Sequence, residues 1–338
     1  MAIRVGLAGY GFGGRSFHAP LIASAAGVEL AGVVTRSPDR RAELERDHPG
    51  TPAFDSLAEL AAAGAQAVAI STPADTHVPL TLEAIGLGLA VVTDKPFALD
   101  AASAREAVEA AEQAGVPLSP YQNRRWDSDL LTVRRLLGSG ELGDVTHFQS
   151  SFERFSDDDG PPPSGGGLLR DFGSHLVDQA LLLFGSVRSA YGEVSPRDDR
   201  FFAALRHEGG VISHLRGGWF EGAPGPRFRV TGSAGSYVVG GVDGQEAALV
   251  AGRTPASEGD AWGVEPEAAW GRLQRGEVSE PVPSERGRWD TFYPAFAAAV
   301  RGDAAVPVDP RDAVRSLEVL DAVRASAAAR QVVDLPRS

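Results

Sequence analysis

The sequence predicts an α/β Rossmann domain with a doubly wound parallel sheet over residues 1–121, followed by an α+β domain with a large, mostly antiparallel sheet over residues 122–338. Three observations predict this fold class. A glycine-rich turn follows the first apolar run, and short apolar runs then alternate with alanine-rich helical patterns for about 120 residues. Beyond Tyr121 the apolar runs are separated by Gly and Pro turns, which is typical of antiparallel strands.

The first domain is expected to contain five strands joined by helices. The strands are expected near residues 3–8, 29–35, 67–71, 90–93 and 116–119. One helix begins at Ser56, because Ser56 and Glu59 have the spacing of a capping box. Another helix runs over residues 100–114 and stops at Gly115.

The second domain mixes helices with short strands. Helices are expected over residues 128–137, 172–183, 289–300 and 311–328, and strands over residues 145–155, 187–194, 200–206, 211–217, 228–231 and 236–239. Residues 157–167 are rich in Asp, Pro and Gly, which predicts a flexible loop. Asp309 and Pro310 are a cap and a first helical residue for the last helix. The C-terminal helices are expected to pack back on the first domain.

Composition excludes several classes of protein. The net charge of −13 argues against a nucleic-acid or anionic-membrane partner. The absence of cysteine excludes disulfides, thiolate zinc sites and cysteine nucleophiles, and it is compatible with a cytoplasmic location. No apolar run approaches the ~20 residues of a membrane span, and glycines interrupt the apolar start that a signal peptide would need.

The turn over residues 9–14 has the pattern G-x-G-x-x-G between a predicted strand and a predicted helix. In this context Gly9 permits a tight turn, Gly11 lets the backbone approach a pyrophosphate, and Gly14 lets the helix pack close to the strand. The N–H groups at the helix start favour the anion. The turn therefore predicts a dinucleotide site, and the alternative is a glycine-rich turn that binds nothing.

The second strand predicts which nicotinamide cofactor is used. NAD-preferring sites usually place a carboxylate about 20 residues after the glycines, on the ribose 2′-hydroxyl. Here Arg36 and Ser37 occupy the end of that strand, and they can bind a 2′-phosphate instead. We therefore expect NADP as the preferred cofactor and NAD as the alternative. Otherwise Arg36 is a solvated surface residue, or it stacks on adenine without selecting the phosphate.

Lys95, Asp171 and His175 are the candidate catalytic residues. Lys95 follows a predicted strand, at the sheet edge where ligands bind in such folds. Asp171 and His175 are four residues apart, so they share one face of a helix. Oxidation of an alcohol needs a base for the hydroxyl proton and a cation for the developing oxyanion, which this set supplies. The alternatives without a function are that Lys95 is a surface charge and that Asp171 and His175 are an ordinary pair on a helix surface. No metal is expected, because two ligands without a third are too few.

Several segments together resemble the Gfo/Idh/MocA oxidoreductases over nearly the whole chain. Residues 94–96 resemble the family's E-K-P motif, with Asp94 in place of Glu. Residues 167–178 resemble its G-x-L-x-D-x-G-x-H-x-x-D motif. Residues 72–77 resemble its T-P-N-x-x-H segment, with Ala74 in place of Asn. The resemblance implies catalytic roles for Lys95, Asp171 and His175. It also implies an open-faced second sheet that forms a homodimer or homotetramer.

Finer features, at residues 17–20, 123–127 and 262–267, resemble a subgroup that includes NADP-dependent scyllo-inositol dehydrogenases. The expected activity is hydride transfer between a nicotinamide and a secondary hydroxyl or ketone of a cyclic polyol or sugar. An inactive regulatory relative and an NAD-dependent glycosidase are the alternatives. The residues expected at the cofactor are Gly9, Gly11, Phe12, Gly14, Arg36, Ser37, Ser71, Thr72, Pro73, His77, Asp94 and Lys95. The weaker candidates for the substrate are His18, Asn123, Arg125 and Arg154.

Overall fold

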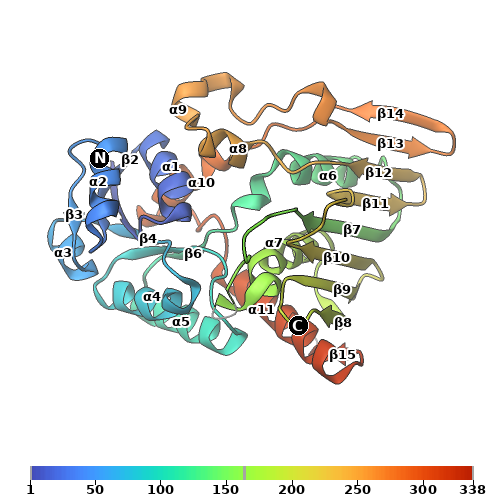
Figure 1. Ribbon diagram of the computed structural model, residues 1–338, viewed down its shortest axis with the longest axis horizontal. Coiled ribbons are helices and arrows are strands. Elements are labelled where there is room, and N and C mark those ends of the chain that lie inside the picture. The colour runs from blue at the N-terminus through green and yellow to red at the C-terminus, as the bar shows by residue number, and fades with distance from the viewer. Residues whose placement is uncertain (1, 163–164, 337–338) are drawn as a thin grey trace.

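A computed structural model describes residues 2–162 and 165–336. The chain forms two β-sheets that lie side by side, each with helices against it (Figure 1). The N-terminal half builds the sheet at the left of the view, and residues beyond 140 build most of the larger sheet at the right. The predicted loop over residues 157–167 includes positions 163–164, which lie outside the described residues.

The first sheet is a six-stranded Rossmann sheet with all pairs parallel, in the order β3-β2-β1-β4-β5-β6. This order reverses direction between β1 and β4, and ligands bind at such a switch point. The strands are β1 Ile3–Ala8, β2 Val28–Val34, β3 Ala53–Phe54, β4 Ala67–Ile70, β5 Ala90–Thr93 and β6 Leu118–Pro120. Five of them match expectation. The two residues of β3 are too few to show a periodic pattern, so sequence reasoning missed it.

The helices of this half are α1 Ala19–Ser24, α2 Pro38–Asp47, α3 Leu57–Ala62, α4 His77–Gly86 and α5 Ala101–Ala114. The two helices with predicted start signals, α3 and α5, begin there. The Ser56 hydroxyl accepts a hydrogen bond from the Glu59 N–H at 3.2 Å and caps α3. Asp100 caps α5 in the same way, and Gly115 ends it with a φ of 65°.

The second sheet has nine strands in the order β14-β13-β12-β11-β7-β10-β9-β8-β15, and all pairs except β7 with β10 are antiparallel. The strands are β7 Val145–Glu153, β8 Val187–Val194, β9 Arg200–His207, β10 Ile212–Gly218, β11 Phe228–Gly232, β12 Gly235–Val239, β13 Gly271–Arg275, β14 Val278–Val282 and β15 Val333–Asp334. Helix α7, Gly167–Phe184, packs against β7, β9 and β10. The mostly antiparallel second sheet is confirmed.

Three expectations for this half need correction. Helix α7 begins five residues before the expected start at 172, because the Leu168 and Leu169 N–H groups donate to the backbone and side chain of Asp198. Residues 251–275, for which the sequence predicts no helix or strand, contain α9 Pro255–Glu258 and β13. Strands β13 and β14 form an edge hairpin with many exposed polar side chains, so they lack the apolar pattern that would predict them.

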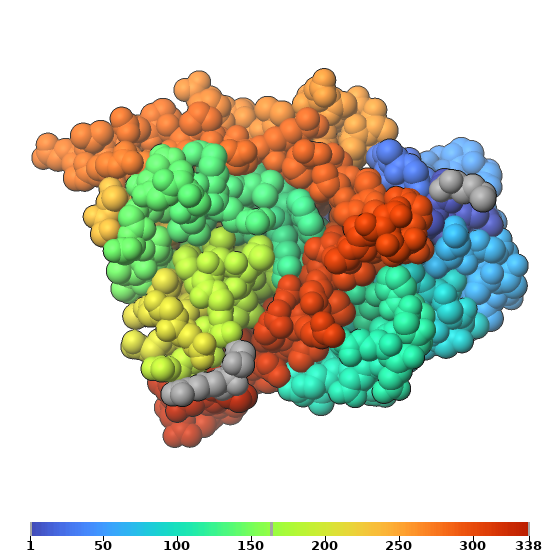
Figure 2. Space-filling view, turned by 180° about the vertical axis from the view of Figure 1, so that it is seen from behind, coloured from blue at the N-terminus to red at the C-terminus, as the bar shows by residue number. Residues whose placement is uncertain are grey.

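The C-terminal helices return to the first half of the chain. Helix α10, Phe292–Val300, shares an apolar core with β1, β2 and α1. Helix α11, Pro310–Ala329, contacts α5 on one side and α7 and β8 on the other, and it forms the red diagonal band between the two halves (Figure 2). Asp309 caps α11, as expected. We propose the division at residues 121 and 122, which follows the last Rossmann strand. In the described chain, none of the helices combines the length and hydropathy needed to cross a membrane.

Candidate active site

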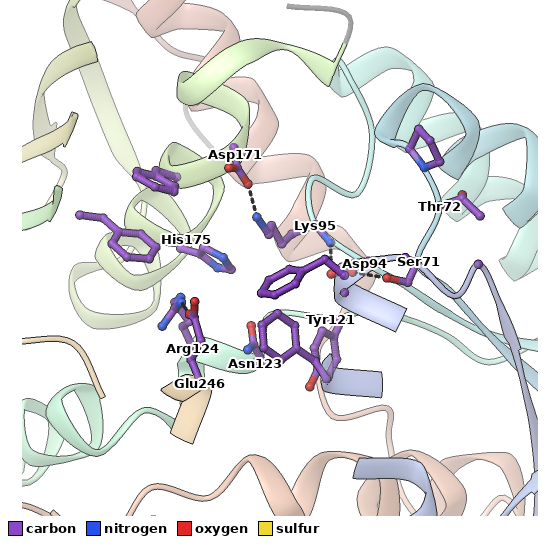
Figure 3. A pocket seen from close by; sticks show the side chains of 18 of the residues that line it. Ser71, Thr72, Asp94, Lys95, Tyr121, Asn123, Arg124, Asp171, His175 and Glu246 are labelled. Atoms are coloured by element: carbon purple, nitrogen blue, oxygen red, sulfur yellow. Dashed lines mark hydrogen bonds and ion pairs between the residues drawn. The ribbon is translucent and has the colours of Figure 1, made fainter. Parts of the chain in front are cut away.

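A cavity of about 550 Å³ lies at the carboxyl ends of β1, β4 and β5 and extends to α7 and the end of β7 (Figure 3). One end is lined by the glycine turn and by the residues that follow β4 and β5. The other end is lined by residues from η3 Asn123–Trp126, β7, α7 and α8 Gln245–Val250. The cavity therefore joins the two halves of the chain, as a site for two reactants requires.

The glycine turn has the geometry that its sequence predicts. Gly9 has a φ of 93°, and a Cβ there would lie 2.4 Å from the Ser71 carbonyl oxygen. A Cβ on Gly14 would lie 2.2 Å from the Gly9 carbonyl oxygen, so only glycine allows this close packing. A Cβ on Gly11 would meet no protein atom within 4 Å. The turn thus leaves open space above Gly11, where a pyrophosphate can approach the backbone.

Four of the predicted cofactor residues lie outside the cavity lining: Gly14, Arg36, Ser37 and His77. Arg36 is exposed just beyond β2 and makes no hydrogen bond or ion pair with the described residues. The Ser37 hydroxyl accepts a hydrogen bond from the Arg40 N–H at 3.4 Å and caps α2. Phe12, by contrast, lines the cavity and is 62% exposed, although it is apolar.

The segment after β4 contributes Ser71, Thr72 and Pro73 to the cavity, but His77 lies behind it. His77 is buried, with Nδ1 2.8 Å from the Pro96 carbonyl oxygen and Nε2 2.8 Å from the Thr72 carbonyl oxygen. The imidazole therefore ties the loop after β4 to the loop after β5. His77 therefore positions these two loops and does not itself line the cavity.

Asp94 organises the loop after β5. Its carboxylate accepts hydrogen bonds from the Ser71 hydroxyl and from the Lys95 N–H, both at 2.8 Å. His18 Nε2 lies 3.2 Å from Asp94 Oδ2, within ion-pair distance but without the angle of a hydrogen bond. Burial raises the pKa of Asp94, but the charges of His18 and Lys95 outweigh burial and hold the pKa below its usual range.

His18 is fully buried behind Asp94 and does not line the cavity. Its Nδ1 lies 2.5 Å from the Tyr293 hydroxyl, which α10 supplies. His18 is one of the predicted substrate residues, but its burial and its contact with Tyr293 favour a packing role over direct contact with a ligand. The C-terminal part of the chain supports the cofactor end through this contact.

Lys95, Asp171 and His175 meet in the cavity, although they come from different halves of the chain (Figure 3). The Lys95 ammonium donates a hydrogen bond to Asp171 Oδ1 in a close ion pair. His175 lies one helical turn after Asp171, and its buried Nδ1 has no hydrogen-bond partner among the described residues. Burial, followed by the positive charges of Lys95, Arg124 and Arg227, holds the pKa of His175 well below its ordinary value. The imidazole is therefore neutral near pH 7 and can accept a proton.

Arg124 is a lining residue that sequence reasoning missed. Its guanidinium pairs with Asp127 at 3.2 Å and, more closely, with Glu246 of α8, and it lies 4.6 Å from the centre of the Phe152 ring. The neighbouring Arg125 was the predicted substrate residue. Arg125 instead donates two hydrogen bonds to Asp178, at 2.6 and 2.8 Å, and pairs with Asp312 at 2.9 Å outside the cavity. The sequence could not tell which arginine faces the site, because η3 is a single irregular turn.

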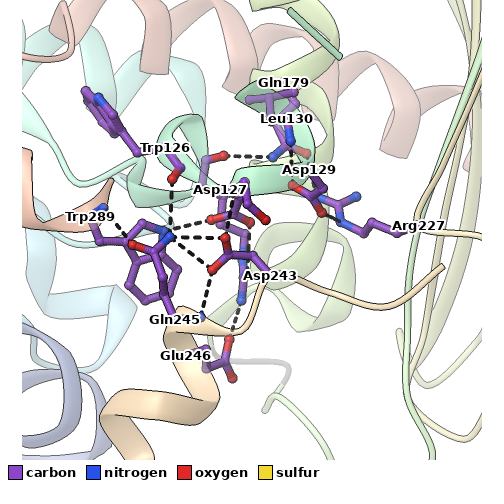
Figure 4. Close-up of polar contacts among 12 residues, drawn as sticks. Trp126, Asp127, Asp129, Leu130, Gln179, Arg227, Asp243, Gln245, Glu246 and Trp289 are labelled. Carbon is purple, nitrogen blue, oxygen red and sulfur yellow. Dashed lines mark hydrogen bonds and ion pairs between the residues drawn. The ribbon is translucent and has the colours of Figure 1, made fainter. Parts of the chain in front are cut away.

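A buried polar cluster lies behind Arg124 (Figure 4). Asp243 accepts hydrogen bonds from the Ser128 N–H and from Gln245, and Asp127 accepts one from the Trp289 indole at 2.7 Å. Asp129 lies 3.4 Å from Arg227. Burial raises the pKa of Asp129 to about 6 and raises the pKa of Asp127 well above its usual value. The cluster fixes the position of Arg124 and supplies part of the charge that acts on His175.

The remaining substrate candidates, Asn123 and Arg154, both line the cavity. So do four aromatic residues that are not among the predicted site residues. These are Phe152, Phe172, Trp219 and Trp289. Flat apolar rings beside Arg, Asn, Asp and Glu groups suit a ligand that has both C–H faces and many oxygens.

Comparison with known proteins gives two family matches. A family model described as oxidoreductase family, NAD-binding Rossmann fold, matches residues 3–122, and one described as GFO/IDH/MocA C-terminal domain matches residues 130–238. The chain is 32% identical to scyllo-inositol 2-dehydrogenase (NADP(+)) IolW of Bacillus subtilis (strain 168), over 98% of this chain and 96% of the relative. It is 35% identical to D-apiose dehydrogenase of Paraburkholderia graminis, over 47% of this chain and 45% of the relative. The solved structure of yvaA from Bacillus subtilis has a TM-score of 0.91 and 31% identity and covers 99% of both chains. These matches confirm the family resemblance and the fold class.

Proposed function

Because the chain belongs to the Gfo/Idh/MocA family of oxidoreductases, we propose that it is an NAD(P)-dependent dehydrogenase for a cyclic polyol or sugar. The reaction moves a hydride between the nicotinamide and a carbon that bears a secondary hydroxyl or a ketone. The observation that carries the proposal is the convergence of Lys95, Asp171 and His175 on a cavity that also contains the glycine turn. The inositol dehydrogenase named above supports the substrate class.

The residues at the first end of the cavity fit a dinucleotide. The space above Gly11 admits a pyrophosphate, and Ser71, Thr72 and Pro73 lie beside it at the switch point of the sheet. When bound, the nicotinamide supplies the carbon that accepts or donates the hydride. We propose NADP as the preferred cofactor, because Arg36 has no partner among the described residues and no carboxylate precedes it at the end of β2.

The roles of the three side chains follow from their contacts. In the oxidative direction, neutral His175 accepts the proton of the substrate hydroxyl, while the hydride leaves the carbon that bears this hydroxyl and passes to the nicotinamide. The Lys95 ammonium stabilises the negative charge that develops on the substrate oxygen. Asp171 holds the ammonium in place through their ion pair. In the reductive direction the same proton returns from the imidazolium to the oxygen.

The test is turnover by Lys95→Met on a panel of polyols and sugars, with NAD and NADP in parallel. The variant should lose turnover by about a hundredfold or more while cofactor binding stays within a factor of two, because the lysine acts on the oxyanion. Unchanged turnover would refute the role of Lys95. Release of an aglycone without cofactor reduction would point to the glycosidase alternative.

We also propose a cytoplasmic homodimer or homotetramer that uses the outer face of the nine-stranded sheet. The rings of His147, Phe202 and His214 gather on this face, while Phe148, Phe201 and Leu215 of the same strands point to the opposite, buried face. A ring cluster at the centre of an open sheet face is a natural contact for a second copy. Light scattering of the purified chain measures its mass directly, and a monomer at micromolar concentration would contradict the proposal.

A further inference from the structure

Arg154 is distinct among the cationic side chains of the cavity. Three lysine or arginine residues line it: Lys95, Arg124 and Arg154. Lys95 is paired with Asp171, and Arg124 with Asp127 and Glu246. The Arg154 guanidinium makes no hydrogen bond or ion pair with any residue that the structure describes. Its charge is therefore available to a ligand.

Three aromatic rings hold the Arg154 guanidinium in place. Its central carbon lies 5.0 Å from the ring centres of Phe172 and Trp219 and 5.4 Å from that of Phe152. The Trp219 indole in turn donates a hydrogen bond to Asp158 at 2.6 Å. Such ring contacts act on the charge of the guanidinium and form no hydrogen bond with its N–H groups. The side chain is thus oriented without any partner for its donors.

The same rings connect Arg154 to the proposed catalytic groups. Phe152 stacks on Phe172 with ring centres 4.2 Å apart, and Phe172 directly follows Asp171 on α7. The His175 ring lies 6.3 Å from Phe152 on another side. A substrate that places a carbon beside His175 can therefore present its more distant oxygens to Arg154.

We propose that Arg154 forms a second substrate subsite, which binds a pair of adjacent oxygen atoms through its guanidinium edge. This inference rests on the proposed function and narrows its substrate class. The pair of oxygens is a carboxylate, as in a sugar acid, or a vicinal diol of a neutral polyol, because the fork of a guanidinium matches both. Asp158 lies within electrostatic range of Arg154 but forms no ion pair with it, so the guanidinium can still pair with a ligand, and its charge favours the carboxylate.

The test compares D-glucose with D-glucuronate, in which carbon 6 is a carboxylate. It adds myo-inositol, a neutral cyclic polyol with vicinal hydroxyls. Arg154→Ala should raise KM by about ten- to a hundredfold with a smaller change in kcat, because a charge-assisted contact is lost in binding. A loss confined to glucuronate identifies the carboxylate, and an equal loss on all substrates identifies the diol. Unchanged KM values overturn the inference and leave the dehydrogenase intact.

Two controls separate binding from packing. Arg216→Ala removes an exposed arginine of the neighbouring strand β10 that pairs with Glu153, and it should leave every KM unchanged. Arg154→Lys keeps the charge without the fork and should recover only part of the affinity. The melting temperature and the NADP dissociation constant of each variant report structural damage.

A binding measurement covers the case in which no substrate of the panel turns over, which would contradict the proposed function. Isothermal titration of glucuronate and myo-inositol into the enzyme–NADP complex then tests the subsite directly. Wild-type binding that weakens at least tenfold in Arg154→Ala supports the subsite. Equal binding by both proteins, or no binding by the wild type, overturns it.

Discussion

The two ends of the cavity are built in different ways. The cofactor end consists of turns that directly follow β1, β4 and β5, so each of its lining residues adjoins a strand in the sequence. The substrate end gathers side chains from η3, β7, α7 and α8, which are far apart in the sequence. The first end is thus set by local backbone geometry, and the second by side chains whose positions depend on tertiary packing.

The electrostatics of the two ends differ in the same way. At the cofactor end, the positive charges of His18 and Lys95 outweigh burial, hold the pKa of Asp94 low and keep it ionised. At the substrate end, burial dominates, so the pKa of His175 is lowered and the pKa values of Asp127 and Asp129 are raised. Burial therefore keeps the His175 imidazole neutral, which suits a group that must accept a proton.

The largest expected effect is at the substrate end. His175→Asn should reduce kcat by about a hundred- to ten-thousandfold, because it removes the proton acceptor. The NADP dissociation constant should stay within a factor of two, since His175 belongs to the other end. Stopped-flow hydride transfer and fluorescence titration measure the two quantities. An equal loss of hydride-transfer rate and of NADP affinity would show that His175 does not act at the substrate end alone.

A matched pair of glycine variants tests the cofactor end. Gly14→Ala should destabilise the fold by about 1–3 kcal/mol, because its Cβ would overlap the Gly9 carbonyl oxygen. Gly11→Ala should leave the melting temperature unchanged, since its Cβ meets no protein atom, but it should weaken NADP binding at least tenfold. Thermal unfolding and NADP titration check both. Normal NADP binding by Gly11→Ala would contradict the placement of the pyrophosphate at this turn.

A smaller effect is expected outside the cavity lining. Arg36→Ala should weaken NADP binding about tenfold and leave NAD binding unchanged, because one charged contact to the 2′-phosphate is lost. Arg46→Ala, an exposed arginine in the last turn of α2, is the matched control. Dissociation constants for both cofactors decide the question. An equal effect on NAD and NADP would leave Arg36 without a selective role.

The smallest effect concerns the buried cluster behind Arg124. The folded-state pKa of Asp129, about 6, lies above the ordinary value of 3.8, so its contribution to stability falls as pH rises from about 4 to about 6. Asn resembles the protonated acid, so Asp129→Asn should be less destabilising, relative to wild type, at pH 7 than at pH 4.5. Urea unfolding at both pH values measures this difference. A change in the opposite direction would mean that Asp129 is stabilised as a carboxylate.

Local signals predicted the elements that depend on neighbouring residues. The caps at Ser56, Asp100 and Asp309 are where the sequence places them, because a cap bonds within its own first turn. The same holds for the glycine turn, since the φ of Gly9 and the close packing of Gly14 are properties of one strand–turn–helix unit. Conversely, β3 and the hairpin of β13 and β14 depend on sheet neighbours and have no strong pattern of their own.

The sequence by itself determined the Rossmann architecture, the glycine turn and the candidate trio of Lys95, Asp171 and His175. Only the tertiary structure decided that α7 starts early on Asp198, that Arg124 faces the cavity while Arg125 turns away, and that Arg154 forms no ion pair with the described residues. The physical reason is the range of the forces involved. Backbone turns and caps are settled within a few residues, whereas burial and ion pairing depend on which distant side chains the fold brings together.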